Sequence, residues 1–278
     1  MAKKIKKLHL VYFSPSGSSE KIVKKIALSI KDIPVETHDL LTSESRKQKY
    51  NFASDELVIF GMMTAGKLFT LSDELFACLN ANDTPFIGVI TYGNGYYGIA
   101  LNEMLSRAEK QGFKVAALGA FIARHSISPE LGDGRPDAED EKIMLDFGKR
   151  AYEKVLSGDL NLHTMPKTNW SSAEAGNQII AYREEHPDEP YMLPPSYKLK
   201  IISDACIKCK TCVRHCPVDA IDIENKKFDL DKCIGCFACV NRCPKHAIKS
   251  TSEEMNDIMI KFSGAFMSRL EPEIFIIN

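Results

Sequence analysis

CIKCKTCVRHCP, residues 206–217, is the stretch that decides how the second part of the chain folds. It recurs as CIGCFACVNRCP at residues 233–244, with every cysteine and the closing proline in the same relative position. The two copies contain every cysteine of the 278-residue chain except Cys78, and Ala-Ile pairs follow both of them, at Ala220-Ile221 and Ala247-Ile248. This repetition indicates an internal duplication, in which two loops carry equivalent cysteines.

The spacing C-x2-C-x2-C-x3-C-P is typical of proteins that bind two [4Fe-4S] clusters. In that arrangement each cluster takes three thiolates from one loop and the fourth thiolate from the other loop. The predicted ligands of the first cluster are Cys206, Cys209, Cys212 and Cys243. Those of the second cluster are Cys233, Cys236, Cys239 and Cys216. The closing prolines, Pro217 and Pro244, donate no N–H and interrupt any helix that leads into the fourth cysteine.

Structural zinc and disulfide bonds are the alternatives for these cysteines. Zinc sites usually pair two CxxC knuckles across a longer loop, whereas here the cysteines form compressed groups of four closed by proline. Disulfides are rare in reducing compartments, and the first half of the chain has the character of a cytoplasmic protein. The pattern therefore favours iron–sulfur clusters.

Length and charge indicate two domains of different character. The 278 residues are many for one core, and the duplicated stretch takes up only about a fifth of them. Residues 196–250 carry eleven Lys and Arg against six Asp and Glu, which leaves the larger remainder acidic. Ordinary solvated faces explain such an imbalance, and so does the docking of an acidic redox partner on the basic module. No basic stripe interleaved with aromatic residues indicates nucleic-acid binding.

The N-terminus gives no targeting signal. A lysine-rich start, Met1–Lys7, precedes an apolar run, Leu8–Phe13, that is too short for a signal-peptide core. No segment is as long as a membrane span. We expect a soluble protein of a reducing cytoplasm, and the cluster chemistry suggests an anaerobic setting.

The first half begins with an apolar strand at Leu8–Phe13, a serine-rich turn and an amphipathic helix. A turn of this kind collects backbone N–H groups and hydroxyls at a helix N-terminus, where an anion can bind. A plain capping loop is the alternative, and the lack of Gly-Lys-Ser/Thr excludes a Walker loop. The turn resembles the flavodoxin phosphate loop, [ST]-x-[ST]-G-x-[ST]. The resemblance implies that the FMN phosphate is held by Ser14, Ser16, Gly17, Ser18 and Ser19.

Strands and helices then alternate up to about residue 156. We expect the further strands at residues 35–40, 56–61, 86–92 and 115–123, and helices at 44–52, 71–79, 99–111 and 140–156. Such alternation predicts an α/β domain with a parallel sheet covered by helices on both faces. Five strands fit the flavodoxin-like order 2-1-3-4-5, in which ligands bind at the carboxyl ends of the strands.

Two more loops lie at those carboxyl ends. By resemblance to flavodoxins they clasp the flavin ring, with residues Met63, Thr64, Ala65 and Gly66 after the third strand, and Tyr92, Gly93, Asn94, Gly95, Tyr96 and Tyr97 after the fourth. We expect Tyr96 or Tyr97 to stack on the ring. The Pro-x-Tyr that is usual after the third strand is absent. The second loop also matches G-x-G-x-x-G, but no acidic residue ends the next strand, so a dinucleotide site is the weaker interpretation.

Several other residues have simpler roles. We expect His125 to be a hydrogen-bonded loop residue, although it follows the fifth strand and is a candidate proton donor near the flavin. His215 and His246 stand beside cluster cysteines without interrupting the ligand pattern, and we expect Cys78 to be a buried residue that packs in the core.

A proline-containing segment separates the domains. We therefore divide the chain into a flavodoxin-like domain (1–157), a linker (158–197), a ferredoxin domain (198–250) and a tail (251–278) whose helix, Glu254–Leu270, packs on the domains.

Both halves together resemble the flavodoxin-ferredoxin fusion proteins of anaerobes. The resemblance implies FMN and two [4Fe-4S] clusters on one chain, an α/β domain followed by an α+β two-cluster ferredoxin domain, and other redox proteins as donor and acceptor. The leading hypothesis is an electron-transfer protein that relays electrons between the clusters and FMN. The alternatives are a flavin-dependent reductase of a quinone or nitro compound, with Tyr97 or His125 as proton donor, and a non-redox interaction module. Whether a homodimer is needed stays open.

Overall fold

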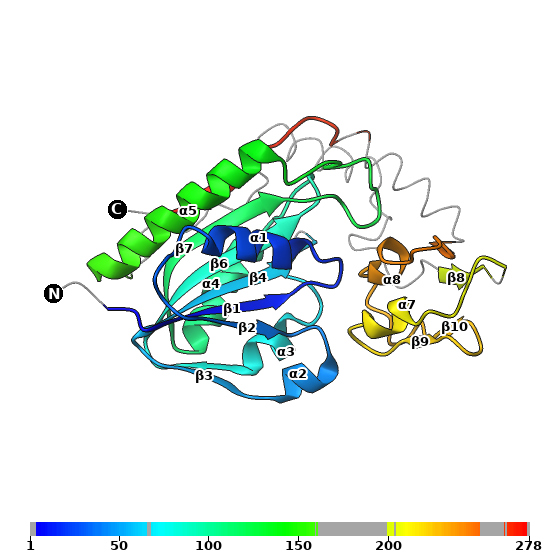
Figure 1. Cartoon of the computed structure of the whole chain (residues 1–278), viewed down its shortest axis with the longest axis horizontal. Coiled ribbons are helices and arrows are strands. Elements are labelled where there is room, and N and C mark those ends of the chain that lie inside the picture. Colours follow the sequence, from blue (N-terminus) through cyan, green and yellow to red (C-terminus); the bar gives the residue numbers. More distant parts are fainter. Residues whose placement is uncertain are drawn as a thin grey trace.

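The computed structural model describes residues 4–65, 68–158, 160, 199–202, 204–250, 264 and 266–276. A six-stranded sheet in the order β12-β7-β6-β4-β1-β2 forms its centre (Figure 1). Its parallel strands are β1 (Lys7–Phe13), β2 (Val35–Asp39), β4 (Glu56–Met63), β6 (Thr84–Tyr92) and β7 (Phe113–Ile122). Without β12 this is the predicted order 2-1-3-4-5, so the flavodoxin-like fold class is confirmed.

The sheet is covered on both faces because β1, β4, β6 and β7 are apolar and buried on both sides. On β1, Leu10 and Tyr12 belong to one buried cluster, whereas Val11 and Phe13 belong to the other. The helices α1 (Ser18–Ala27) and α5 (Ala138–Ser157) pack on the first cluster, and α3 (Ser72–Ala77) and α4 (Ala100–Lys110) pack on the second. This doubly covered sheet places the loops after β1, β4 and β6 along one edge.

Two short strands replace parts of predicted helices. The predicted helix at 44–52 is α2 (Ser43–Lys47), and it is followed by β3 (Tyr50–Phe52); the helix at 71–79 likewise ends before β5 (Leu79–Ala81). The two short strands pair in parallel. The helix ends because Gln48 adopts an extended backbone, and Tyr50 and Phe52 then pack their rings against His38 and His9. Aromatic packing thus overrides the helical pattern in this segment.

The C-terminal tail supplies a strand that the sequence analysis did not foresee. β12 (Glu273–Phe275) pairs antiparallel with β7 and protects that sheet edge. Most of the predicted helix Glu254–Leu270 lies outside the described residues, but residues 266–270 are turn and coil. The Asn94 side chain donates to the carbonyls of Phe266 and Ser268 and accepts from the Leu270 N–H. In a continuing helix the carbonyls of Phe266 and Ser268 and the N–H of Leu270 would instead form backbone hydrogen bonds within the helix.

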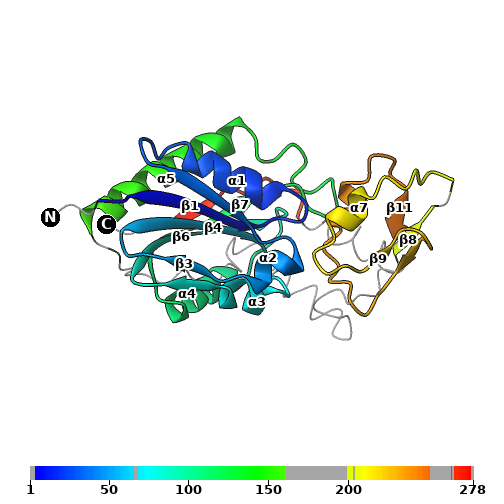
Figure 2. The ribbon, with the colours of Figure 1, turned by 60° about the horizontal axis from the view of Figure 1, so that its bottom comes forward.

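The cysteine-rich module lies beside the carboxyl edge of the sheet (Figures 1 and 2). Two antiparallel ribbons frame it, β8 (Leu199–Ile201) with β11 (Ile248–Ser250) and β9 (Ile221–Asp222) with β10 (Lys227–Phe228). The third cysteine of each copy lies in a one-turn helix, Cys212 in α7 (Thr211–Arg214) and Cys239 in α8 (Ala238–Asn241). The predicted linker 158–197 lies almost wholly outside the described residues. Among the described residues, no helix combines the length and apolarity required to cross a membrane.

Candidate functional site

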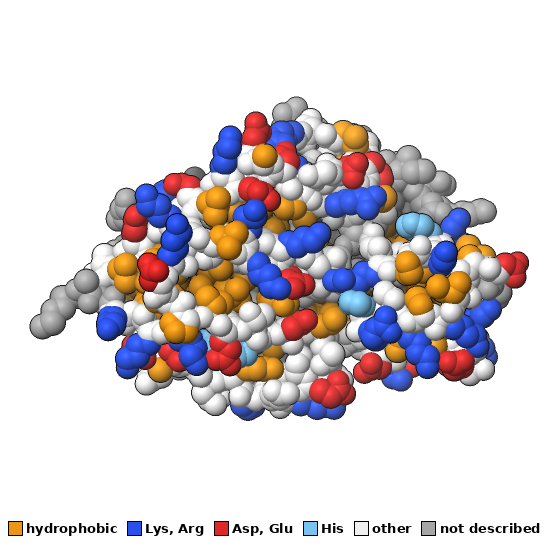
Figure 3. All heavy atoms as spheres, in the orientation of Figure 1, with side chains coloured by type: hydrophobic (Ala, Val, Ile, Leu, Met, Phe, Trp, Pro, Cys, Tyr) orange, Lys and Arg blue, Asp and Glu red, His pale blue; other side chains and the backbone are white. Residues whose placement is uncertain are grey.

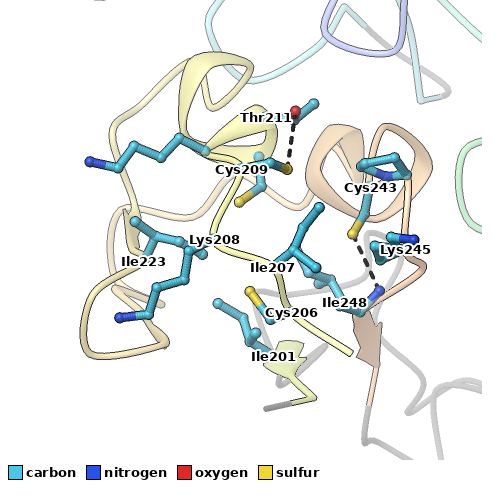
Figure 4. A pocket seen from close by; sticks show the side chains of 14 residues that line it. Ile201, Cys206, Ile207, Lys208, Cys209, Thr211, Ile223, Cys243, Lys245 and Ile248 are labelled. Atoms are coloured by element: carbon cyan, nitrogen blue, oxygen red, sulfur yellow. Dashed lines mark hydrogen bonds between the residues drawn. The ribbon is translucent and has the colours of Figure 1, made fainter. Parts of the chain in front are cut away.

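The first cavity of the module is lined by four cysteines from both copies of the repeat. Cys206, Cys209 and Cys212 come from the first copy and Cys243 from the second. Figure 4 shows Cys206, Cys209 and Cys243 around this space, together with isoleucine side chains that also line it. The structure therefore brings together the four residues that the spacing grouped as the first cluster.

The second cavity has the reciprocal composition. Cys233, Cys236 and Cys239 line it from the second copy, and Cys216 joins them from the first. Cys236 and Cys239 are buried, and the apolar side chains of Ile221, Phe228 and Phe237 complete the lining. Each cavity thus offers four thiols, and no carboxylate is among the described residues that line either one. The histidine that lines the second cavity, His215, has its Nδ1 2.9 Å from the Thr211 carbonyl.

The backbone conformation, like the cysteine spacing, is the same in the two copies of the repeat. Positive φ angles occur at equivalent positions of the two copies, in the pairs Lys208 and Gly235, Lys210 and Phe237, and Asp219 and His246. The left-handed residues turn each loop around its cavity. The N–H of Ala220 donates to Cys216 Sγ and that of Ala247 to Cys243 Sγ, both at 3.2 Å. Such N–H···S bonds stabilise negative charge on sulfur, which is what a cluster ligand carries.

Burial controls the ionisation of these thiols. It raises the pKa of Cys236 to about 12, and it also raises the pKa of Cys239, Cys233 and Cys212. Cys209 differs because it is exposed, and the Thr211 hydroxyl holds its pKa below the ordinary value. The buried thiols become ligands only when a cation compensates the charge of the thiolate. Two pockets of four thiols fit iron–sulfur clusters in this respect.

The serine loop presents unused donors at the start of α1. Gly17 caps the helix with a φ of 91°, and Ser14 Oγ accepts from the Glu20 N–H at 3.0 Å. Within the described part of the chain, the backbone N–H groups of Ser16, Ser18 and Ser19 have no hydrogen-bond partner. These three donors at the positive end of a helix dipole fit a phosphate group.

An arginine from the cysteine module reaches this same loop. Arg242 Nε donates to the Pro15 carbonyl at 2.6 Å. Its guanidinium lies over Gly17, where an added Cβ atom would be only 2.9 Å from Arg242 Nη2. The phosphate-loop candidate therefore contains a positive charge that the sequence analysis did not identify. No sequence signal could have found it, because the contact joins residues far apart in the chain and depends on how the two domains pack.

The two expected ring loops differ in how far they are packed. After β4, Met63 and Ala65 are half-buried, the Thr64 N–H donates to the Thr91 carbonyl, and Gly66 lies outside the described residues. After β6, Asn94 is buried and bonded to the C-terminal tail. This second loop is therefore fixed by contacts from the far end of the chain.

The two tyrosines of the β6 loop have different environments. Tyr97 is 0% exposed, lies edge-on to Tyr92, and donates its hydroxyl to Glu273 Oε2 at 3.0 Å. Tyr96 is only half-buried, and its ring centroid is 6.2 Å from that of Phe266. Tyr97 thus occupies a packing position, and Tyr96 is the more exposed of the two tyrosines.

His125 is a structural neighbour of the same loop. Its Nδ1 accepts the N–H groups of Ile127 and Ser128 at 3.2 and 3.0 Å, and burial lowers its pKa to about 4. The ring lies so close to Gly93 that an added Cβ there would be 2.2 Å from His125 Cδ2. His125 is therefore a neutral, hydrogen-bonded loop residue, as the sequence analysis expected, and glycine is required at position 93.

The second cavity adjoins the sheet edge directly. Cys236 and Ala238 belong to the same buried cluster as Phe13 of β1 and Tyr97 of the β6 loop. The buried Arg46 of α2 donates to the carbonyl of Pro217, next to Cys216, at 2.7 Å, and Asn241 donates to the Ser126 carbonyl at 2.8 Å. These contacts join the module to the loops where a flavin would bind.

The sheet order and the paired cysteine cavities define a fusion of a flavodoxin-like domain with a two-cluster ferredoxin-type module. Residues 198–244 match the family described as 4Fe-4S dicluster domain, which confirms the predicted module. No curated protein is significantly similar in sequence to this chain.

Solved structures align with about half of the chain. A flavodoxin from the domain Archaea is 18% identical over 54% of this chain and 98% of its own, with a TM-score of 0.38. A flavodoxin of Streptococcus pneumoniae TIGR4 is 15% identical over 55% and 99%, with a TM-score of 0.38. An oxidoreductase from Corynebacterium diphtheriae is 14% identical over 58% and 99%, with a TM-score of 0.40.

Proposed function

We propose that the protein is an electron-transfer protein that relays electrons between two [4Fe-4S] clusters and FMN. The observation that carries this proposal is the contact between the second cysteine cavity and the carboxyl edge of the sheet. Cys236 and Ala238 share a buried cluster with residues of the flavin-side loops, and Arg242 of the cysteine module donates to the Pro15 carbonyl in the serine loop. Cofactors in these sites would be neighbours within one chain.

The serine loop and Arg242 would hold the FMN phosphate. In the described part of the chain the N–H groups of Ser16, Ser18 and Ser19 have no partner, and the Arg242 guanidinium lies over Gly17 in the same loop. The helix dipole and the side-chain charge would therefore act together on a phosphate. Tyr96 would cover one face of the ring, and the backbone of Gly93 and Gly95 would meet its polar edge. FMN, when bound, supplies a carrier of one or two electrons, whereas each cluster passes one at a time.

Electrons would enter or leave through the first cluster. Cys236 and Pro217, which line the second cavity, contact the flavodoxin-like domain, whereas the first cavity contains the exposed Cys209. Figure 3 shows Lys and Arg side chains on this module. Glu224 bonds Lys208 and Lys210, whereas Lys245 is exposed. An acidic redox protein of a reducing, anaerobic cytoplasm suits such a surface.

The reductase hypothesis receives less support from the same residues. Its proton donors would be Tyr97 and His125, yet Tyr97 donates to Glu273 and His125 is buried, neutral and bonded to backbone N–H groups. Neither presents a transferable proton to a substrate above the ring.

The test is an anaerobic preparation of the full chain, analysed for iron, acid-labile sulfide and flavin. We expect about eight irons, about eight sulfides and about one FMN per chain. Zinc in place of iron and sulfide would overturn the cluster assignment. A chain with eight irons that does not retain FMN on reconstitution would overturn the relay and favour an interaction module.

A further inference from the structure

We propose that His9, Glu36 and His38 form a site for a divalent transition-metal ion, for which zinc is the best-suited candidate. The three side chains lie on one face of the neighbouring strands β1 and β2, where His9 pairs with Glu36 and Val11 pairs with His38. The site is distinct from the cysteine cavities and from the three flavin-side loops. It does not depend on the electron-transfer proposal.

The potential donor atoms, one from each residue, all lie within 4.8 Å of one another. His9 Nδ1 is 3.0 Å from His38 Nε2, Glu36 Oε2 is 3.9 Å from His9 Nδ1, and Glu36 Oε1 is 3.8 Å from His38 Nε2. Zinc–ligand bonds of about 2.0–2.1 Å place tetrahedral donors about 3.3 Å apart. Small side-chain rotations would therefore bring all three atoms to bonding distance, and the fourth position would stay open to solvent.

Neighbouring residues support the histidines as they do in metal sites. A ligating histidine usually directs its other ring nitrogen at a carboxylate. His9 Nε2 is buried and has no hydrogen-bond partner in the described part of the chain, and it lies 3.5 Å from Glu56 Oε1. With a metal on Nδ1, Nε2 would carry its proton and point toward this carboxylate.

Aromatic rings restrict the motion of both imidazoles. Phe52 lies edge-on to His9 with centroids 4.9 Å apart, and Tyr50 lies edge-on to His38 at 5.0 Å. The imidazoles themselves stack at 5.2 Å. These contacts pre-organise the two nitrogen donors, which reduces the ordering cost of binding an ion.

The donor set selects the class of metal. Two imidazoles and one carboxylate suit zinc and its transition-metal neighbours, whereas calcium and magnesium prefer oxygen donors. Lys7 Nζ lies 3.0 Å from Glu36 Oε2 and competes for it, but this lysine is partly exposed and can turn into solvent. A simple hydrogen-bonded histidine pair is the competing explanation, and metal loading separates the two.

The experiment uses the full chain with its clusters, prepared anaerobically, stripped with a chelator and dialysed against buffered zinc. We expect about one zinc per chain without loss of iron. Zinc-edge X-ray absorption should show nitrogen and oxygen neighbours at about 2.0–2.1 Å and no sulfur shell at about 2.3 Å, which would mark zinc in the cysteine cavities.

His38→Gln and Glu36→Gln should each weaken zinc binding at least about tenfold, the loss that follows even from removing an outer-shell partner. Thr37→Ala is the matched control, because Thr37 is an exposed residue of the same strand and points to its other face. Unchanged iron content verifies that the variants fold. Absence of bound zinc, a sulfur shell, or equal affinity in all three variants would each overturn the proposal.

Discussion

Arg242 is the residue that links the two halves of the proposed site. It precedes the predicted cluster ligand Cys243, yet its guanidinium lies against the Pro15 carbonyl and Gly17 of the serine loop. One side chain therefore connects the second cluster loop with the predicted phosphate site. The occupancy of one site should affect the other through this contact.

Replacing Arg242 by alanine should weaken FMN binding by about ten- to hundredfold. A hydrogen bond to a charged group contributes roughly 1.5–3 kcal/mol, which corresponds to that range of Kd. Equilibrium dialysis of FMN against the full chain measures the effect. Lys245→Ala, which removes an equal charge from an exposed position of the same module, should leave the Kd within about twofold. Equal losses of FMN affinity in both variants would contradict the prediction, because they would show that Arg242 acts only through its general charge.

Gly17 should tolerate no side chain, for two reasons that act together. Alanine in the left-handed region costs about 1–2 kcal/mol, and its Cβ would displace the Arg242 guanidinium. We expect Gly17→Ala to weaken FMN binding, and the losses in the Gly17→Ala, Arg242→Ala double variant to be less than additive.

Gly158→Ala is the control for the backbone term, since Gly158 has a similar φ of 83° with nothing within 4 Å of an added Cβ. It should cost stability without affecting the flavin. Strictly additive losses in the double variant would show that Gly17 and Arg242 act separately.

His125 should make stability depend on pH. Its pKa is lowered from 6.5 to about 4 in the folded chain, because burial disfavours the charged ring. The unfolded chain binds the additional proton between these values, so stability is lost as pH falls below 6.5. Between pH 8 and pH 5.5 this amounts to about 1.4 kcal/mol.

Anaerobic thermal unfolding at the two pH values tests this dependence. His125→Gln should remove that part of the pH dependence, whereas His246→Gln, at an exposed position, should retain it. The prediction is wrong if the slope survives in His125→Gln.

At the scale of elements, the sequence predicted the parts whose signal is local. The five parallel strands and the helices α1, α4 and α5 follow from apolar runs and helical periodicity, and the grouping of four cysteines per cavity follows from the duplicated spacing. The missed features are long-range. β3 is held by aromatic rings that pack on His9 and His38, and β12 is held by its pairing with β7. Arg46 contacts the cysteine module by donating to the carbonyl of Pro217. Neither periodicity nor motif spacing carries information about such contacts.

The C-terminal tail should depend on Asn94 for its attachment. The Asn94 side chain makes three hydrogen bonds to residues 266–270, each worth about 1 kcal/mol. Asn94→Ala should therefore raise hydrogen exchange in residues 266–276 by at least about tenfold. Asn80→Ala, which removes an exposed bond to Asn51, should not change exchange in the tail. Unchanged protection in Asn94→Ala would mean that β12 alone holds the tail.

At the scale of the whole molecule, the arrangement of two cavities and one sheet edge suggests a fixed order of carriers. The first cavity contains the exposed Cys209, and the second contacts the flavin-side loops through Cys236. A chain with this order needs no second protein to bring its clusters to its flavin. Electron transfer between the clusters and the flavin should therefore occur within one molecule.

The most direct test of this claim is the rate of flavin reduction after a light flash has generated a one-electron reductant. Anaerobic full chain with all cofactors is used at protein concentrations that span at least about tenfold, and the flavin absorbance is followed after the clusters have been reduced. The account predicts a first-order phase whose rate constant does not change with protein concentration. A rate constant that rises in proportion to concentration, or clusters that stay reduced while the flavin stays oxidised, would contradict it.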